Sequence, residues 1–395
     1  MKRYDVVIVG AGPAGSTVAK HIAENSDVSV LLIDKHAEIG VPKRCGEGLS
    51  ARVFREFGLP LEKRFINRAM YGAAIYAPNG DALKVRYDEP NGYVIERKIF
   101  DKFLAYYASK AGAEVKACYY ANIWKENGKI KGVEAEGIDG KEKIEAKIIV
   151  AADGVESQIA RQADIDTRIP LSEIDSCFEY EMSNLKIEES DLIHIYLGNE
   201  IAKRGYVWIF PKDEDRANVG VGIAGDCEKT AKYYLDKFIR KHKKIFSKAS
   251  ILEVNVGCVP VGGFLKTLVK DNVVVVGDAA RQVNPIHGGG IYEAMYAGRL
   301  AGLAIVKALE NNNVSLLKEY EKRWWAERGR KLRNVLKVRK FAENLSDEEM
   351  NFLAKIWSAE DLIELGRGNL SAFKILIKKA IRYPRLISLA KRFLV

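Results

Sequence analysis

The stretch YDVVIVGAGPAGSTVAKHIAENSDVSVLLIDK, residues 4–35, decides the fold. An apolar run over residues 4–9 is followed by glycines spaced G-x-G-x-x-G, then by a helix-type pattern and a second apolar run over 28–34. This order predicts a strand, a glycine turn, a helix and a second strand, which is the dinucleotide-binding half of a Rossmann-like α/β fold.

Each glycine in the turn has a separate expected use. Gly10 makes the tight turn, Gly12 lets a pyrophosphate approach the backbone, and Gly15 lets the helix pack on the strand. The helix starting at Pro13 directs free N–H groups and a positive dipole end at that pyrophosphate. Asp34 lies 19 residues after Gly15 and is placed to bond a ribose 2′-hydroxyl, which excludes a phosphate there and hence NADP. A glycine turn without a ligand is the alternative.

Two later stretches favour FAD over NAD. KIIVAADGVES, residues 147–157, reads as an apolar strand that ends near Asp153. DNVVVVGDAARQVNPIHGGGIYEAMYAGRLAG, residues 271–302, reads as a buried strand, a loop and a helix that starts near Gly290. Asp278 can bond ribityl hydroxyls, and the positive end of the helix can stabilise charge on a reduced flavin. The chain is therefore expected to bind FAD.

The stretch GYVWIFP, residues 205–211, places aromatic residues at alternate positions. Along a strand, Tyr206, Trp208 and Phe210 would share one face, and the aliphatic residues between them would share the other. A strand that is apolar on both faces is usually buried in a core. The alternative is that the aromatic face forms the wall of a cavity for a long apolar ligand.

Composition limits the class of protein. The chain has 395 residues, of which 48% are hydrophobic and 29% charged, which is enough for two or three domains. A net charge of +10 suggests an anionic partner, either nucleic acid or a membrane surface. The five cysteines contain no CxxC pair, so no metal or iron–sulfur site is expected and a reducing cytoplasm fits. No apolar stretch approaches 18 residues, so no membrane span is expected.

The glycine fingerprint, the Asp-Gly pair and the Gly-Asp pair occur in the order typical of the FAD-dependent superfamily of the para-hydroxybenzoate hydroxylase type, and the chain resembles that superfamily. Within it, VPKRCGEG (41–48), YVWIFP (206–211) and GDAARQVNPIHGGGIYEAM (277–295) resemble segments of the geranylgeranyl reductases that saturate archaeal membrane lipids. The resemblance covers most of the first 330 residues. One departure is Lys203, where that family often has proline.

The resemblance implies an α/β (α+β) architecture in which the FAD domain is discontinuous in sequence. It places the Rossmann-like FAD-binding domain at 1–70, 95–165 and 258–310, an inserted antiparallel-sheet substrate domain at 71–94 and 166–257, and a C-terminal helical, basic amphipathic region at 311–395.

The resemblance also implies a set of site residues. Those expected to hold FAD are Gly10, Gly12, Ala14, Gly15, Asp34, Arg44, Cys45, Gly46, Gly48, Arg97, Ala121, Asp278, Gly289, Gly290 and Ile291. For Arg97, a surface salt bridge with Glu96 or Asp101 is the alternative. Tyr206, Trp208 and Phe210 become one wall of a tunnel for the prenyl chain.

The expected reaction saturates isolated C=C bonds of geranylgeranyl chains in digeranylgeranylglyceryl phosphate or phospholipids, by hydride from reduced flavin plus a proton. The candidate proton donors are Cys45 first, then His287, with Tyr206 also able to donate. A packing cysteine and a histidine hydrogen-bonded within its turn are the alternatives. Ferredoxin, a reduced deazaflavin and NADPH remain open as electron donors.

The last thirty residues, 366–395, contain eight basic residues and no acidic ones, interleaved with aliphatic residues. This pattern predicts a segment that lies at the inner face of the cell membrane and a cytoplasmic, peripheral enzyme. A basic helical pair packed on the protein is the alternative, and nucleic-acid binding is not expected. Two rival functions share the fold: an aromatic-type FAD monooxygenase and a non-catalytic prenyl-lipid carrier.

Overall fold

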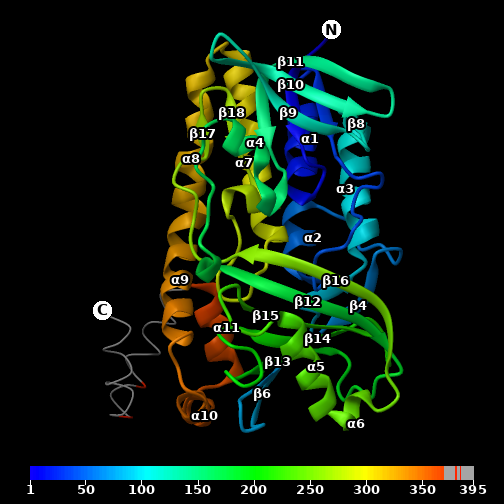
Figure 1. Ribbon diagram of the computed structural model, residues 1–395, viewed down its shortest axis with the longest axis vertical. Coiled ribbons are helices and arrows are strands. Elements are labelled where there is room, and N and C mark those ends of the chain that lie inside the picture. Colours follow the sequence, from blue (N-terminus) through cyan, green and yellow to red (C-terminus); the bar gives the residue numbers. More distant parts are fainter. Residues whose placement is uncertain (369–378, 380–382, 384–395) are drawn as a thin grey trace.

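The computed structural model describes residues 1–368, 379 and 383. It forms an elongated molecule with one large sheet at each end and long helices running between them (Figure 1). The predicted interfacial segment at 366–395 falls almost entirely outside the described residues.

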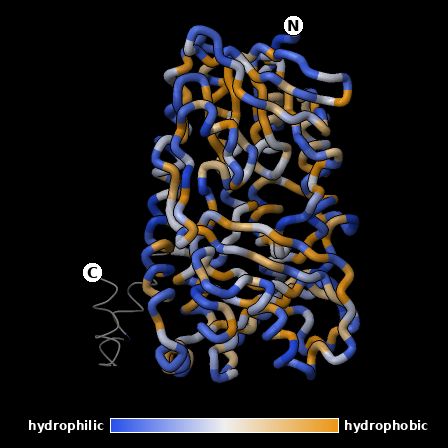
Figure 2. Tube along the Cα trace, in the orientation of Figure 1, coloured by the Kyte–Doolittle hydropathy of each residue, from blue (hydrophilic) through white to orange (hydrophobic). Residues whose placement is uncertain are grey.

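The sheet at the upper end of Figure 1 has eight strands, in the order β17-β18-β11-β1-β2-β8, with β10 paired to β11 and β9 paired to β10. Its strands are β1 (Lys2–Val9), β2 (Val30–Ile33), β8 (Glu114–Lys116), β9 (Tyr120–Glu126), β10 (Lys129–Gly137), β11 (Gly140–Ala151), β17 (Val269–Lys270) and β18 (Val273–Val275). The strands β18, β11, β1, β2 and β8 run parallel. A parallel sheet is buried on both faces at its centre, which explains why β2, β18 and the ends of β1 and β11 are continuous apolar runs. Figure 2 shows these apolar strands at this end of the molecule.

Next to this sheet, α1 (Pro13–Asn25) packs against α7 (Ile291–Glu310) and α3 (Arg97–Lys110). The predicted strand, turn, helix and strand of residues 4–35 are confirmed with small shifts of their ends. The predicted helix after the glycine run is also confirmed, because α7 begins at Ile291.

The sheet at the lower end has seven strands in the order β16-β12-β15-β14-β13-β5-β6. Its strands are β5 (Gly72–Tyr76), β6 (Ala82–Arg86), β12 (Ile174–Ser183), β13 (Leu192–Leu197), β14 (Tyr206–Pro211), β15 (Ala217–Ala224) and β16 (Ser250–Pro260). All neighbours are antiparallel except β5 and β13, which run parallel.

A small sheet and further helices connect these two layers. The small sheet has the order β3-β7-β4, with β3 (Gly48–Ser50), β4 (Ile66–Met70) and β7 (Gly92–Ile95). The other helices are α2 (Ala51–Phe57), α4 (Gln158–Gln162), α5 (Ala231–Lys241), α6 (Lys243–Phe246), α8 (Lys318–Trp324), α9 (Arg330–Ala342), α10 (Asp347–Ile356) and α11 (Ala359–Arg367).

The two faces of the seven-stranded sheet have different surroundings. On β14, Val207 and Ile209 are buried in a core that includes Leu235 and Phe238 of α5. Tyr206, Trp208 and Phe210, the alternate residues of β14, lie on the opposite face, which is turned toward the half of the molecule that contains the eight-stranded sheet. The sheet therefore presents one closed face to α5 and leaves its other face available to line a cavity.

Candidate active site

A cavity of about 990 Å³ lies between the two large sheets. It starts at Gly12 and Ala14, at the first turn of α1, and passes the loop of Cys45 and the aromatic face of β14. It ends among apolar side chains of β5, β6, β13, α10 and α11. One continuous space thus joins a nucleotide-type helix end to an apolar compartment.

The glycine turn is shaped by close backbone packing. Gly10 has φ of +106°, and a Cβ there would overlap the carbonyl oxygen of Ala152. A Cβ on Gly15 would overlap the carbonyl oxygen of Gly10. A Cβ on Gly12 would meet no described atom within 4 Å, so this position borders open space. The three expected uses of these glycines match this geometry, with Gly12 left free for a ligand to approach.

Asp34 is held beside the glycine turn. The backbone N–H of Ala11 donates to Asp34 Oδ2 at 2.8 Å, and the backbone N–H of His36 donates to Oδ1 at 2.9 Å. These bonds fix the carboxylate at the end of β2, close to the N-terminus of α1. This arrangement suits a carboxylate that is to accept hydrogen bonds from a ribose.

Asp278 lies where the cavity meets the start of α7. A Cβ on Gly290 would lie 3.0 Å from Asp278 Oδ1, which shows how near the carboxyl group is to the helix N-terminus. Within residues 1–368, no hydrogen bond to this carboxyl group is found. Burial raises its pKa, and the charge of Arg97 opposes that shift. A polar group left unsatisfied in a cavity indicates a ligand with hydroxyl donors, and the ribityl chain of FAD is such a ligand.

The loop of residues 41–48 lies directly on the aromatic strand. A Cβ on Gly46 would be 3.1 Å from Trp208 Nε1, and a Cβ on Gly48 would be 3.1 Å from Phe210 Cε2. Any side chain at either glycine would press on the rings. Two segments that the sequence analysis treated separately therefore form one surface.

The aromatic wall packs closely on β15 because β15 contributes glycines beneath it. Tyr206, Trp208 and Phe210 all line the cavity, with ring centroids 5.9 and 6.1 Å apart along the strand. A Cβ on Gly220 would overlap the indole of Trp208, which lies across that glycine. The cavity interpretation of the GYVWIFP strand thus fits its aromatic face, and the core interpretation fits its aliphatic face.

Arg97 combines both of its expected positions. Its guanidinium pairs with Asp101, with Nη2 and Oδ2 3.2 Å apart, and the residue also lines the cavity. Its backbone N–H donates to Glu47 Oε1 at 2.6 Å. Arg97 thus pairs with Asp101, one of the two predicted partners, but this ion pair is largely buried and does not lie on the surface. Its position on the cavity leaves a contact with a cofactor open.

The three candidate proton donors are in different states. Burial raises the pKa of Cys45, whose Sγ accepts a hydrogen bond from the backbone N–H of Glu47 at 3.2 Å, so it is a neutral thiol. The surrounding protein lowers the pKa of His287 to about 4, and its Nδ1 accepts from the N–H of Gly289 at 3.1 Å. The hydroxyl of Tyr206 donates to the carbonyl oxygen of His287 at 2.7 Å. His287 is thus a neutral imidazole hydrogen-bonded in its turn, as the alternative predicted.

The predicted FAD residues divide into two groups by position. Those that line the cavity are Gly12, Ala14, Arg44, Cys45, Gly46, Gly48, Arg97, Asp278, Gly289, Gly290 and Ile291. Those packed behind its surface or at its end are Gly10, Gly15, Asp34 and Ala121. Ala121 is buried on β9 at 4% exposure, and its expected contact with the adenine stays a prediction.

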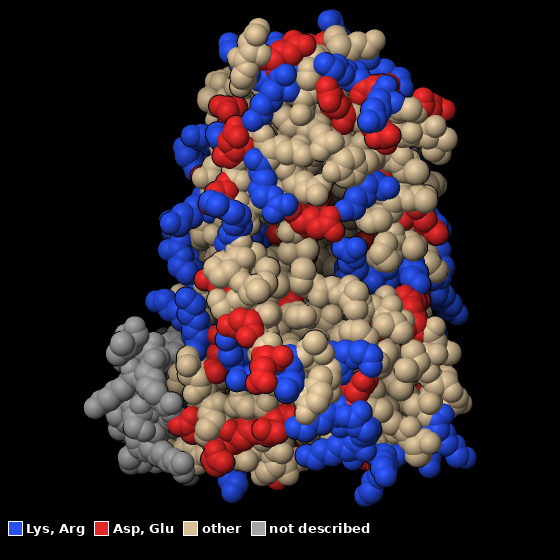
Figure 3. All heavy atoms as spheres, in the orientation of Figure 1, with Lys and Arg blue, Asp and Glu red and all other residues tan. Residues whose placement is uncertain are grey.

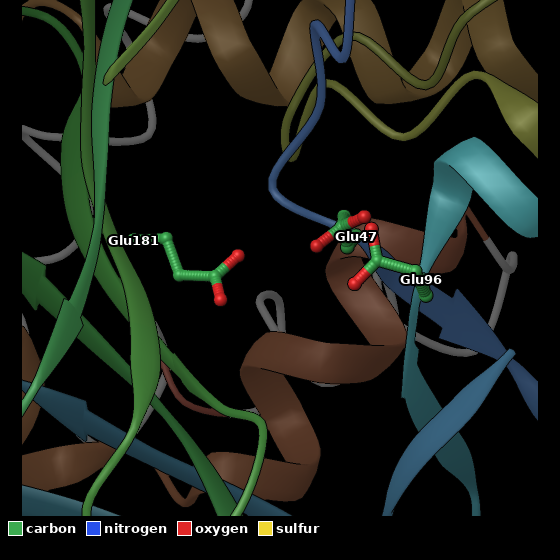
Figure 4. Close-up of side chains that lie close together, drawn as sticks. All are labelled: Glu47, Glu96 and Glu181. Atoms are coloured by element: carbon green, nitrogen blue, oxygen red, sulfur yellow. The ribbon is translucent and has the colours of Figure 1, made fainter. Parts of the chain in front are cut away.

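A buried cluster of charged residues borders the cavity, and the sequence analysis did not predict it. Figure 4 shows Glu181 pointing from β12 toward Glu47 and Glu96. These carboxylates are close enough together to hold a metal ion. Lys212 Nζ lies between them instead, at 3.0 Å from Glu47, 2.9 Å from Glu96 and 2.9 Å from Glu181. An ammonium group thus takes the place that a cation would need.

The cluster extends along β12 to a second carboxyl group on the cavity wall. Lys43 Nζ lies 3.2 Å from Glu47 and 3.4 Å from Glu181, but 3.7 Å from Glu179 Oε1. Glu179 and Cys177 line the cavity. The signal was the alternation in CFEYEMS, residues 177–183, which usually indicates a polar face in contact with solvent. Here the polar face of β12 is buried because the loop of residues 41–48 covers it.

Comparison with known proteins agrees with this arrangement. Residues 173–259 match the family described as the geranylgeranyl reductase catalytic domain, and residues 8–86 match the NAD(P)-binding Rossmann-like domain. The chain is 41% identical to digeranylgeranylglycerophospholipid reductase 2 of Methanopyrus kandleri, over 99% of both chains. It is 43% identical to digeranylgeranylglycerophospholipid reductase of Methanocaldococcus jannaschii, over 89% of this chain and 90% of that protein.

Solved structures show the same fold. A geranylgeranyl bacteriochlorophyll reductase-like protein of Thermoplasma acidophilum superposes with a TM-score of 0.90 at 34% identity, over 100% of both chains. The flavin-dependent brominase Bmp2 superposes with a TM-score of 0.74 at 20% identity, over 97% of this chain and 100% of that one. The second likeness concerns the fold alone.

Proposed function

The chain belongs to the family of digeranylgeranylglycerophospholipid reductases, and we propose that it saturates the isolated C=C bonds of geranylgeranyl chains on archaeal glycerolipids inside the cavity described above. It is an FAD-dependent oxidoreductase that acts on CH–CH groups of geranylgeranyl lipids. The observation that best supports the site is the continuity of the cavity from the first turn of α1 to the apolar compartment.

The apolar compartment suits a polyprenyl chain. Beyond the aromatic wall the lining includes Ile75, Ile193 and Ile195 from the sheet, with Leu353 and Trp357 opposite them. Long unbranched cavities with apolar and aromatic walls bind ligands by excluding water from them, and few polar groups are required. The geranylgeranyl chain offers repeated isolated alkenes and no polar group of its own.

Reduced FAD, when bound, supplies a hydride to one carbon of the alkene. The chain's own residues then have four tasks. Gly12 and the first turn of α1 would hold the pyrophosphate, while Asp34 and Asp278 would accept hydrogen bonds from hydroxyl groups. The faces of Trp208 and Phe210 would stabilise positive charge at the more substituted carbon. The closed cavity would keep water away from that carbon.

Single-turnover oxidation of the flavin tests this proposal. The purified protein is reduced with dithionite without oxygen, and digeranylgeranylglyceryl phosphate is added while absorbance is followed at about 450 nm, where oxidised flavin absorbs. We expect the absorbance to return and the lipid to gain two hydrogens per turnover by mass spectrometry. The lipid with fully saturated chains is the matched control and should leave the flavin reduced.

The same experiment separates the two rival functions. A flavin that ignores the lipid but reoxidises with air and an aromatic product would indicate the monooxygenase. A protein that binds the lipid but cannot be reconstituted with FAD would indicate the carrier. Either result would overturn the reductase proposal.

The electron donor is a finer part of the proposal. Reduced deazaflavin, ferredoxin and NADPH are the three candidates, and the rate of flavin reduction by each, measured without lipid, distinguishes them. We expect a donor other than NADPH, because the second G-x-G-x-x-G match, residues 220–225, lies along the antiparallel strand β15 and not in a turn between a strand and a helix. Flavin reduction by NADPH within seconds would contradict this.

A peripheral position on the membrane is a further part of the proposal. No helix among the described residues has the length and apolar character needed to span a bilayer. Lys and Arg gather over α5 and α6 in Figure 3, and residues 231–248 contain seven basic residues and one acidic residue. This basic patch lies at the same end of the molecule as β6 and α10, which border the apolar end of the cavity (Figure 1).

Sedimentation with lipid vesicles tests membrane association. We expect the protein to pellet with anionic vesicles and to be released by high salt, because basic patches bind such surfaces electrostatically. Replacing Lys241, Lys243 and Lys244 with Gln should weaken the binding, while the activity toward detergent-dispersed lipid should stay unchanged. Equal binding to neutral and anionic vesicles would contradict the role of the patch.

A further inference from the structure

We propose that the carboxyl group of Glu179, on the cavity wall beside Trp208, supplies the proton that completes reduction of the C=C bond, an inference that rests on the function proposed above.

The position of Glu179 follows from the register of three strands. Glu179 on β12 pairs with Gly220 on β15, and Gly220 pairs with Trp208 on β14. Because Gly220 has no side chain, the indole lies across it and reaches the next strand. Its Nε1–H donates to Glu179 Oε2 at 3.0 Å. The indole that faces the substrate compartment therefore also fixes the carboxyl group in place.

The second oxygen of this carboxyl group is in an unusual state. Glu179 Oε1 is buried, accepts no hydrogen bond from any described residue, and lies 3.7 Å from Lys43 Nζ. An ionised oxygen in this state would lose its hydration, and the Lys43 ammonium group at 3.7 Å compensates only in part. A proton on Oε1 removes that charge, and the residue that carries it lines the cavity.

The balance of charge in the cluster favours one such proton. Three of its carboxyl groups, on Glu47, Glu179 and Glu181, are buried, and so are its two ammonium groups, on Lys43 and Lys212. Glu96, which shares Lys212, is partly exposed and adds a further negative charge. Arg216 also reaches Glu181, at 3.0 Å, but shares its charge with Asp213. One protonated carboxyl group makes the buried set neutral. Glu179 has the longest contact with an ammonium group and is the one left for that proton.

The acidities of the carboxyl groups point to the same residue. Burial, assisted by the charge of Glu47, raises the pKa of Glu179 to about 8, although Lys43 and Lys212 oppose the shift. For Glu181, burial also acts to raise the pKa, but the hydrogen bond and charge of Lys212 prevail and lower it. Two carboxyl groups on one strand face thus have opposite protonation states near neutral pH, which is typical of an acid beside a structural anion.

The other titratable groups around Glu179 do not ionise in the same pH range. Cys45 on the loop and Cys177 on β12 both have pKa values raised by burial and remain thiols. On β16, Asn255 pairs with Glu179 in the strand register and is uncharged. Glu253, on the same strand, raises the pKa of Lys43 by its charge. A change in the activity between about pH 7 and 9 therefore reports the ionisation of Glu179.

The reaction balances with the components already named. One carbon of the alkene takes a hydride from the reduced flavin, which becomes oxidised, and the other carbon takes the proton of Glu179, which becomes a carboxylate. Two electrons pass from the flavin to the new CH–CH unit. Glu179 regains a proton from water before the next turnover, and no other oxidant or reductant takes part.

The test compares Glu179→Gln with Glu181→Gln. Glutamine at 179 keeps an oxygen that can accept the hydrogen bond of Trp208 but has no proton to transfer. Residue 181 belongs to the same strand face and the same charged cluster, yet does not line the cavity. Both variants are assayed for flavin content, for lipid affinity and for the rate of single-turnover flavin oxidation by the unsaturated lipid between about pH 6 and 9.5.

We expect the wild-type rate to fall about tenfold per pH unit above about pH 8, because only the protonated acid donates. Glu179→Gln should be at least about a hundredfold slower and independent of pH, with flavin content and lipid affinity retained. Glu181→Gln should keep the alkaline fall in rate. A Glu179→Gln variant with the wild-type rate and pH profile would overturn the proposal.

Two measurements keep the test independent of that variant's folding. In Trp208→Phe, the lost N–H no longer favours the carboxylate, so the alkaline fall in rate should move to higher pH. Infrared spectra of the flavin-free protein should show a protonated carboxyl signal that disappears between about pH 7 and 9. An unshifted fall in rate, or a carboxyl group already ionised at neutral pH, contradicts the inference. A wild-type flavin that the lipid cannot oxidise contradicts the proposed function itself, whatever the infrared result.

Discussion

The nucleotide end of the cavity and its sheet wall are formed by different parts of the chain. The nucleotide end is formed by the backbone of residues 10–15, which are neighbours in the chain. The sheet wall is formed by side chains from residues 43–48 and from three strands that begin more than a hundred residues later. Glycine serves both parts, but Gly12 makes room for a ligand and Gly220 makes room for the indole of Trp208. Glycine is thus needed at Gly12 because of the local turn, and at Gly220 because a side chain from another strand packs on it.

The nucleotide end and the sheet wall also differ in charge. The glycine turn offers N–H groups and a helix dipole to an anion. The wall contains carboxylates and ammonium groups that form ion pairs with one another. These groups are buried and have lost their hydration. Buried ion pairs of this kind are strongly destabilised when one partner is removed. Substitutions at the wall should therefore change stability, and substitutions at the turn should change binding.

The largest effect is expected at the centre of the charged cluster. Lys212→Met leaves Glu47, Glu96 and Glu181 without their shared ammonium group, and we expect the free energy of unfolding in urea to fall by about 3–5 kcal/mol. Lys229→Met removes a surface ion pair and is the matched control, with an expected change under about 0.5 kcal/mol. Equal stabilities of the two variants would mean that the wall does not depend on its buried charges.

The next effect is expected at the nucleotide end and concerns binding. Gly12→Ala places a methyl group in the space that a pyrophosphate would approach, and the FAD affinity should fall at least about tenfold, or about 1.4 kcal/mol. Calorimetry on the flavin-free protein measures this. Gly58→Asn is the control, because Gly58 also has open space around it and Asn tolerates its left-handed backbone. A loss of stability in Gly12→Ala without a loss of affinity would break the contrast.

A smaller effect is expected from the pH dependence of stability. Burial raises the pKa of Glu179 from its ordinary value of 4.5 to about 8 in the folded protein, so its contribution to stability is present at low pH and is lost as the pH rises from the ordinary value through 8. Glu179→Gln cannot ionise, and at about pH 9 it should be more stable than the wild type by more than about 1 kcal/mol. At about pH 5 the two should be alike. Urea unfolding at both pH values is the measurement, and a wild type that is the more stable at pH 9 would contradict the raised pKa.

The smallest effects are expected on the two faces of β14. Ile209→Val creates a small cavity in the core under α5 and should cost about 1 kcal/mol of stability with lipid affinity unchanged. Phe210→Leu removes a ring from the cavity wall and should weaken lipid binding several-fold with little change in stability. Unfolding and lipid titration of both variants separate the faces. If both changed stability alone, the aromatic face would be core.

Much of this fold could be read from the chain because the signals are local. The strand, glycine turn and helix of residues 4–25, the Asp-Gly pair and the helix start after Gly290 depend on residues close in sequence. The family segments placed the aromatic strand and the Cys45 loop at the site, and both line the cavity. The contact between them, through Gly46 and the ring of Trp208, required the folded chain.

The sequence by itself determined the cofactor-type half and the family, because G-x-G-x-x-G, the Gly-Asp pair and their flanking strands act through backbone geometry within a few residues. It did not determine which faces of β12 and β15 are covered, and so the alternation that contains Glu179 and Glu181 indicated a face in contact with solvent, while Gly220 carried no signal. Only the tertiary structure decided that these polar positions turn inward. Packing of the two halves buries Glu179 and Glu181, and this burial raises the pKa of Glu179. Lys43 and Lys212 are needed as the partners that compensate the buried negative charge.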